Sequence, residues 1–459
     1  MIYTDTRDSS AKVDFKTAVV NGMSSATGGL YVPIEFPKVE ISKMMKDGKP
    51  DFVSAAIEMA KPYVEGEIPD ADLEALIKDA YPFESKLVKI EDGTYVLELS
   101  HGPTCAFKDF GARFMARAMS FFNRGENGKL HILVATSGDT GSAVGSAFHN
   151  VEGLDVTILY PEGKISPLQE KQLSTFTGNV RALKVKGTFD DCQKLVKTAF
   201  TDKDLRAKFR LSSANSINIS RLLPQGFYYM YAALQAKYEN PGKEIIVTVP
   251  SGNFGNLTSG LIAREMGAPI TGFVAATNSN RTIPDWIATS EYKARPSVET
   301  YANAMDVGAP SNYERIAYMY SLEDVRKLFA SYWLDNDGIV KAIKACFDST
   351  GYTIDPHGAV AYRAWEDIKN GALERLEGID ITKPGITPNK PDWADCAKSA
   401  VGIILETADP AKFSAIVKDA IGKDPAIPER LQKVMALPDR AIPMENDYNK
   451  FKDWLIANL

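Results

Sequence analysis

The sequence predicts an α/β fold built from parallel sheets flanked by helices. From about residue 98, short apolar segments alternate with amphipathic ones, and this alternation is typical of parallel sheets covered on both faces. Two of the predicted strands run into turns rich in glycine and small polar residues, where ligands of open parallel sheets bind. The predicted strands are 130–135, 155–160, 180–185, 244–249, 271–276 and 401–406.

The residues before this alternation have a different pattern. Apolar residues recur at helical spacing within 51–64 and 71–81, so we expect residues 1–97 to form a mostly helical N-terminal region. Residues 98–459 then form the second region. The stretches near 278–312 and 376–396 interrupt the alternation, and we expect them to be irregular insertions. A chain of 459 residues has room for two or three domains.

Composition narrows the classes of partner. The net charge is −6 and no long run of Lys or Arg occurs, which argues against nucleic acid and against an anionic membrane surface. A small anionic ligand is still compatible, because a few local basic groups suffice to bind one. The N-terminus has no apolar signal core and no apolar run reaches bilayer length, so the expected location is the cytoplasm.

The cysteines and histidines give no metal-binding pattern. The four cysteines are widely spaced with no CxxC pair, as expected for reduced thiols. The four histidines include no HExxH and no close pair. We therefore expect no protein metal site.

The two polar turns are the most informative segments. The first turn, 136–141 (TSGDTG), follows the strand 130–135, and the second, 251–256 (SGNFGN), follows the strand that ends at Pro250. Each leads into a helix, so its backbone N–H groups lie at the positive end of a helix dipole, a geometry that binds phosphate. The alternative is that each turn is only a tight connection.

Common nucleotide and hydrolase motifs are absent. Neither turn is GxGxxG, no Gly-Lys pair precedes Ser or Thr, and no GxSxG elbow occurs. The turns therefore indicate a smaller phosphorylated cofactor or substrate.

Two further segments carry candidate reactive and binding groups. Lys108 follows Phe107 just before a helical run, and apolar neighbours would lower the pKa of a Schiff-base lysine. The alternative for Lys108 is a solvated surface lysine. In 212–225, Arg221 with Asn215 and Ser216 would form an anion site, and the alternative there is a polar loop with a helix cap.

Taken together, these segments resemble the threonine synthase family, in its longer-chain bacterial and fungal branch. The resemblance covers nearly the whole chain. The matching stretches are GGLYVP (28–33), HGPTCAFKDFG (101–111), ATSGDTG (135–141), YPEGKISPLQEKQ (160–172), NSINISR (215–221), VPSGNFGN (249–256), NAMDVGAPSN (303–312) and DPHGAVAYRA (355–364).

The resemblance implies a fold-type II enzyme dependent on pyridoxal 5'-phosphate (PLP), with the cofactor between two α/β subdomains of residues 98–459. Its reaction would convert O-phospho-L-homoserine and water to L-threonine and phosphate. Lys108 would hold the cofactor as a Schiff base, and Asp139 would lie near the cofactor's 3-oxygen. The cofactor phosphate would be held by Ser251, Gly252, Asn253, Phe254, Gly255 and Asn256, and the pyridine nitrogen would face Thr407.

The resemblance also implies a substrate site. Ser137, Thr140, Asn215, Ser216 and Arg221 would surround the substrate's carboxylate and phosphate. One departure concerns Asp409, where family members commonly have His. That departure places an anion near the expected position of the ring.

Other functions are compatible with the same residues. A PLP phospho-lyase would release 2-oxobutyrate from the same substrate, and a serine or threonine deaminase would act on a substrate without phosphate. A non-catalytic binding protein could keep the fold, although the retained Lys108 argues against it. The oligomeric state does not follow from the sequence.

Overall fold

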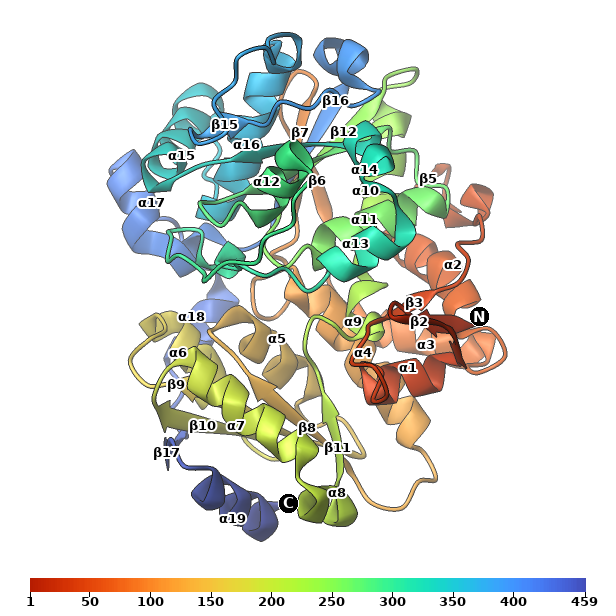
Figure 1. The fold of residues 1–459 in the computed structure, drawn as a ribbon, viewed down its shortest axis with the longest axis vertical. Helices are drawn as coiled ribbons and strands as arrows, with labels where there is room; N and C mark the ends of the chain where they lie inside the picture. The colour runs from red at the N-terminus through yellow and green to blue at the C-terminus, as the bar shows by residue number, and fades with distance from the viewer.

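Two separate β-sheets organise the chain, one in each half of the molecule (Figure 1). The computed structural model describes residues 1–459. The larger sheet has seven strands in the order β15-β14-β13-β12-β16-β7-β6, and the smaller has five in the order β11-β8-β9-β10-β17. The larger sheet consists of β6 (Lys86–Glu91), β7 (Thr94–Glu98), β12 (Ile245–Pro250), β13 (Gly272–Thr277), β14 (Phe329–Trp333), β15 (Gly385–Ile386) and β16 (Val401–Glu406); the smaller consists of β8 (Leu130–Ala135), β9 (Leu154–Pro161), β10 (Val180–Lys186), β11 (Arg210–Ser213) and β17 (Ile442–Glu445).

The α/β prediction is confirmed. Each of the six predicted strands is a strand of the structure, and no end differs by more than one residue. The smaller sheet is entirely parallel, whereas β6 and β15 run antiparallel at the two edges of the larger sheet. Central strands such as β12, β13 and β16 are buried along their whole length, which explains their continuous apolar sequences.

Helices cover both sheets. In the lower lobe, α4 (Lys108–Asn123) packs against α5 (Asp139–Phe148), while α7 (Phe189–Thr201) contacts β8 and α19 (Tyr448–Asn458). In the upper lobe, α16 (Pro356–Lys369) contacts β12, β13 and β16. The other helices are α6 (Pro167–Ser174), α8 (Lys203–Lys208), α9 (Ile219–Leu222), α10 (Gln225–Glu239), α11 (Gly255–Glu265), α12 (Thr282–Thr289), α13 (Tyr313–Met319), α14 (Leu322–Leu328), α15 (Asn336–Thr350), α17 (Ser414–Ile421), α18 (Glu429–Met435) and the short η5 (Pro410–Phe413).

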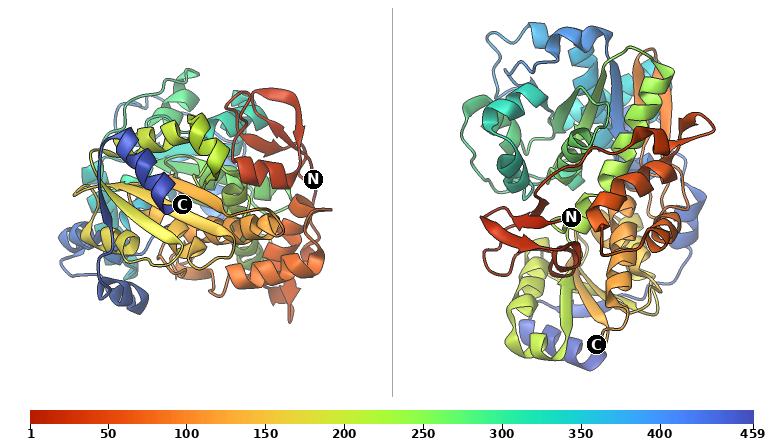
Figure 2. Two further views of the ribbon diagram at one scale, coloured as in Figure 1. Left: turned by 90° about the horizontal axis from the view of Figure 1, so that it is seen from below. Right: turned by 90° about the vertical axis from the view of Figure 1, so that its right-hand side faces the viewer.

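The N-terminal region lies beside the junction of the two lobes, as the side view in Figure 2 shows. It contains the expected helices α2 (Phe52–Val64) and α3 (Asp70–Ala80), together with α1 (Phe15–Asn21). It also contains a three-stranded sheet that the sequence did not predict. Strands β6 and β7 begin before residue 98 yet belong to the larger sheet, and the boundary at residue 97 stays a prediction. The additional elements are β1 (Tyr3–Asp5), β2 (Asp8–Val13), β3 (Tyr31–Pro33), η1 (Ile41–Met44), β4 (Met45–Lys46) and β5 (Lys49–Pro50).

The two stretches expected to be irregular contain short elements. Within 278–312, α12 occupies 282–289 because an apolar set of Ile283, Trp286 and Ile287 is buried there at helical spacing; the remainder is coil apart from η2 (Asn303–Met305). Within 376–396, only β15 and the start of η4 (Ala394–Ser399) are regular, and η3 (Ala372–Glu374) precedes the stretch. No helix of the structure is both long enough and apolar enough to cross a bilayer.

Candidate active site

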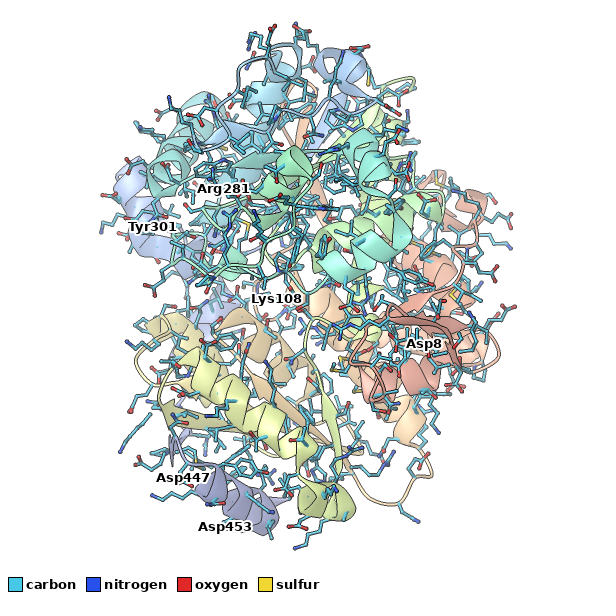
Figure 3. All side chains as sticks on the ribbon, in the orientation of Figure 1. Asp8, Lys108, Arg281, Tyr301, Asp447 and Asp453 are labelled. Atoms are coloured by element: carbon cyan, nitrogen blue, oxygen red, sulfur yellow. The ribbon has the colours of Figure 1, made fainter.

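Lys108 lies between the two lobes, close to the point where several strands end (Figure 3). It is the first residue of α4, and the preceding Phe107 donates its backbone N–H to the carbonyl of Thr407 at 2.9 Å. Ala106 pairs with Ala408 in an isolated antiparallel bridge. The segment before Lys108 is therefore attached to the end of β16 by backbone hydrogen bonds.

The environment of Lys108 shifts its amine toward the neutral form. The residue is half-buried, and protein atoms surround its ammonium group. The loss of hydration there lowers the pKa of Lys108 to about 8. The negative charge of Asp139 raises the pKa of Lys108, whereas the positive charges of Lys412 and Arg221 lower it further. An amine with a pKa near neutrality releases the lone pair that a nucleophilic lysine needs. The surface alternative for Lys108 does not fit this environment.

The second turn, 251–256, forms an open backbone loop. Phe254 has a positive φ of 60°, and α11 begins immediately after it at Gly255. A Cβ at position 252 would lie 2.6 Å from Met305 Cα, so only glycine fits where the two backbone segments come this close. Ser251 anchors the turn by donating its hydroxyl to the carbonyl of Val249 at 2.8 Å.

Asn256 leaves a polar group available at the second turn. Its Oδ1 accepts hydrogen bonds from the hydroxyls of Tyr228 and Tyr229 at 2.6 and 2.8 Å. Its Nδ2 is buried and has no hydrogen-bond partner in the chain. A buried donor without a partner is costly, and an anionic ligand in the turn would satisfy it.

Asn253 connects the second turn to the segment that contains Arg221. Its Nδ2 donates to the Ser216 hydroxyl at 2.8 Å, and its Oδ1 accepts from the backbone N–H of Ser311 at 2.6 Å. The predicted cofactor and substrate residues are thus in direct contact. Asn215, next to Ser216, is half-buried.

Arg221 is a buried guanidinium with no acidic partner. Its exposed fraction is 2%. Nη1 donates to the carbonyl of Ala214 at 2.7 Å, while Nε has no partner. Burial lowers the pKa of Arg221 to about 10. A buried positive charge is stable when an anion approaches it, so Arg221 can receive a phosphate or carboxylate. The loop-and-cap alternative leaves this charge unexplained.

In the first turn, 136–141, a side chain of the turn itself already binds two of the backbone N–H groups. Thr136 Oγ1 accepts from the backbone N–H groups of Gly138 and Gly141 at 3.0 and 2.9 Å. Ser137 is exposed at the tip of the turn, and Thr140 is half-buried. Both residues flank Asp139 on this turn, and their grouping with Asn215, Ser216 and Arg221 around the substrate stays a prediction.

Asp139 is paired with a lysine that the sequence did not identify. Lys412 Nζ lies 2.5 Å from Asp139 Oδ1, and Gln169 Nε2 donates to the same oxygen at 3.1 Å. Burial opposes ionisation of Asp139, but Lys412 and Lys108 outweigh burial and keep the pKa of Asp139 well below its usual range. Lys412 is in η5, five residues after Thr407, and no local pattern in the sequence marks it as part of the site.

Asp409, where the family commonly has His, forms a local cap. Its Oδ1 accepts from the backbone N–H of Ala411 at 2.9 Å and thereby caps η5. Burial raises the pKa of Asp409, while Arg430 and Lys412 act in the opposite direction. The carboxylate of Asp409 is therefore engaged in capping η5.

A second network that the sequence did not reveal supports both the strand end and the second turn. Asp355 Oδ1 accepts from His357 Nδ1 at 2.9 Å, and Asp355 Oδ2 accepts from the backbone N–H of Ala408 at 2.9 Å. His357 Nε2 accepts from the backbone N–H of Ala304 at 3.1 Å, next to Met305, which contacts Gly252. The DPHG and NAMDVG stretches are thus joined by a hydrogen bond and together connect the end of β16 to the second turn.

The donor set fits a phosphorylated aldehyde cofactor. It combines an amine of lowered pKa, an open turn at a helix N-terminus and an unpaired buried amide donor. Residues 81–378 match the family model described as "Pyridoxal-phosphate dependent enzyme", so the chain is an enzyme of this class. The models "Threonine synthase N terminus" and "Threonine synthase, C-terminal" match residues 2–81 and 393–455. The chain belongs to the threonine synthase family.

Individual relatives agree with this assignment. The chain is 41% identical to threonine synthase from Haemophilus influenzae over 97% of each chain. The crystal structure of threonine synthase from yeast is similar with a TM-score of 0.87 and 32% identity, covering 100% of this chain and 99% of that one. A PLP-bound threonine synthase from Brucella melitensis has a TM-score of 0.85 and 31% identity, covering 99% and 98%.

Proposed function

We propose that the chain converts O-phospho-L-homoserine and water to L-threonine and phosphate, with pyridoxal phosphate held by Lys108. The observation that carries this proposal is the buried Arg221, which has no acidic partner and lies close enough to Lys108 to lower the pKa of its amine. A substrate with a phosphate group would supply the missing anion. A deaminase substrate without phosphate would not.

Each residue of the site has a role in this proposal. Ser251 to Asn256 would bind the cofactor phosphate, and Thr407 would donate or accept a hydrogen bond at the pyridine nitrogen. When bound, the cofactor acts as an electron sink for the amino-acid substrate. Lys108, with a pKa near 8, would carry protons between the substrate's Cα, Cβ and Cγ. Arg221 would stabilise the phosphate as it leaves.

The substrate would be oriented by neutral donors around Arg221. Ser137 and Thr140 come from the first turn, and Asn215 and Ser216 precede α9. The hydrogen bond from Asn253 to Ser216 supports a fixed distance between cofactor and substrate groups. Closure of such a site against bulk water would favour addition of one ordered water at Cβ over release of 2-oxobutyrate.

Domain organisation and location are part of the same proposal. We place the cofactor between the two α/β subdomains of residues 98–459, with residues 1–97 as a separate region beside them. The four cysteines are unpaired, which supports a reducing location such as the cytoplasm.

Product analysis tests the proposed reaction. Purified holoenzyme is incubated with O-phosphohomoserine, and amino acids, keto acids and phosphate are separated and quantified. We expect threonine and phosphate in equal amounts with little 2-oxobutyrate. Predominant 2-oxobutyrate would instead support a phospho-lyase, and no phosphate release would contradict both reactions.

The cofactor lysine has its own test. Lys108→Ala should lose the visible absorption band of the bound cofactor and nearly all turnover. Lys418→Ala, which removes an exposed ion pair with Asp424, is the matched control and should keep both. A Lys108→Ala variant that retains the band and the activity would contradict the assignment.

A further inference from the structure

Lys412 is a second buried lysine at the active site. Its side chain has no exposed surface, and its ammonium contacts two acceptors, Asp139 Oδ1 at 2.5 Å and the carbonyl of Thr104 at 3.2 Å. Thr104 is four residues before Lys108, and Asp139 begins α5. Lys412 therefore connects the segment carrying the reactive lysine to the first polar turn.

Helix α6 fixes this ion pair from the opposite side. Gln169 Nε2 donates to Asp139 Oδ1 at 3.1 Å, and Gln172 Nε2 donates to the Thr104 carbonyl at 3.0 Å. Both acceptors of Lys412 thus receive a second hydrogen bond from α6. Such a closed arrangement gives the carboxylate of Asp139 one orientation.

The ion pair solves an electrostatic problem at the site. A lone, buried carboxylate at position 139 would attract the nearby ammonium form of Lys108 and keep it protonated. Instead, Asp139 is bound to Lys412, and no ion pair joins it to Lys108. The charged groups that act on Lys108 are Asp139, Lys412 and Arg221. The titratable groups around Lys412 are Asp139, Lys108, Asp109, Asp409 and Cys105.

We propose that Lys412 is a positioning residue of this active site: it binds the Asp139 carboxylate in a closed ion pair and so leaves the Lys108 amine free to take up the cofactor. The proposal rests on the proposed role of Lys108. It assigns a function to a residue outside the cofactor turns and the substrate segment. It also explains how an acidic residue is tolerated beside a lysine that must lose its proton.

The test uses uptake of pyridoxal phosphate by the apoprotein, which requires no turnover. The initial rate at which the bound-cofactor absorption band appears is recorded between about pH 6 and pH 10, because only the neutral amine reacts. For the wild-type protein, we expect the midpoint of this rate near pH 8. Circular dichroism of each variant verifies that it is folded.

The two single variants should shift this midpoint in opposite directions. Lys412→Met leaves the Asp139 carboxylate beside Lys108, so the midpoint should rise by about one pH unit and uptake at pH 7 should slow about 10-fold. Asp139→Asn leaves Lys412 and Arg221 without a counter-charge, so the midpoint should fall below that of the wild type. A merely structural role would reduce the amplitude in both variants without opposite shifts.

The double variant Lys412→Met/Asp139→Asn removes both charges together. Its midpoint should return to within about 0.5 pH unit of the wild type, because the two perturbations cancel. Lys418→Met is the control and should leave the midpoint unchanged. Shifts of the same sign in both single variants, or an unaltered midpoint in Lys412→Met, would overturn the proposal. Uptake of pyridoxal phosphate by Lys108→Ala with the wild-type absorption band would contradict the role of Lys108 itself.

Discussion

The two polar turns have similar sequences but different physical properties. The first turn, 136–141, contains an acidic residue at the start of its helix, and that residue is neutralised by a buried lysine. The second turn, 251–256, contains no charged residue, has a left-handed Phe254 and approaches the neighbouring backbone closely at Gly252. Both turns lie at the end of a parallel strand and before a helix.

This difference supports the proposal that the second turn binds the cofactor phosphate. At the second turn, the backbone N–H groups and the helix dipole meet no competing charge, so a phosphate can bind there. At the first turn, Asp139 already occupies the favourable position for an anion at the helix N-terminus. The charge that a glycine-rich turn itself carries is therefore our reason for assigning the cofactor phosphate to the second turn.

The largest expected loss of cofactor affinity comes from a substitution in the second turn. Gly252→Ala places a methyl group 2.6 Å from Met305 Cα and 3.1 Å from the Ala304 carbonyl, which are backbone atoms that yield little. Overpacking of about 3 kcal/mol would weaken cofactor affinity roughly 150-fold. The measurement is a titration of apoprotein with pyridoxal phosphate.

The first turn provides the comparison for this variant. In Gly141→Ala the added methyl group would meet the buried side chains of Thr136 and Leu173, so this variant overpacks the first turn in the way that Gly252→Ala overpacks the second. We expect a smaller loss of cofactor affinity than in Gly252→Ala. Equal losses in the two variants would mean that both turns bind the cofactor phosphate.

The next effect tests where the substrate's phosphate binds. Arg221→Ala removes charge-assisted hydrogen bonds of about 1.5–3 kcal/mol, so kcat/KM for O-phosphohomoserine should fall about 10- to 150-fold. Cofactor content should change little, because we propose that the second turn binds the cofactor phosphate without help from Arg221. A large loss of cofactor with unchanged kcat/KM would reverse these assignments.

A smaller effect is expected at the end of β16. Thr407→Val keeps the shape of the side chain and removes one hydrogen bond of about 0.5–1.5 kcal/mol, so kcat should fall about 2- to 10-fold. The absorption maximum of the bound cofactor should shift as well. A variant with the wild-type spectrum and the wild-type kcat would show that the hydroxyl does not face the ring.

The smallest effect on catalysis is expected at position 409. Asp409→His restores the residue common in the family and removes the cap on η5, which should lower the free energy of unfolding by about 0.5–2 kcal/mol. Urea denaturation measures this loss. The ratio of threonine to 2-oxobutyrate should stay constant, and a changed ratio would place Asp409 in the catalytic machinery.

Several features of the site were predictable from the sequence because they depend on local patterns. The strand–turn–helix units at 130–148 and 245–265 combine apolar strands, small polar turns and helical spacing within one short segment. The pairing of Asn253 with Ser216 was predictable only in outline, since the resemblance grouped the two segments without giving the contact. Helix α12 was missed because polar residues on both sides masked its apolar face.

By itself, the sequence determined the α/β class, the six central strands and the two polar turns, because apolar periodicity and turn chemistry act over neighbouring residues. Lys108 and Arg221 were singled out by the resemblance to the threonine synthase family, since local pattern left a surface lysine and a polar loop as alternatives. Only the tertiary structure decided how the charges are balanced. In the folded chain, Arg221 is buried without an acidic partner, and Lys412 forms an ion pair with Asp139. Asp355 and His357 form a hydrogen-bonded network beside the second turn. These residues are far apart in the chain, and their interaction energies depend on distance and burial, which no local pattern encodes.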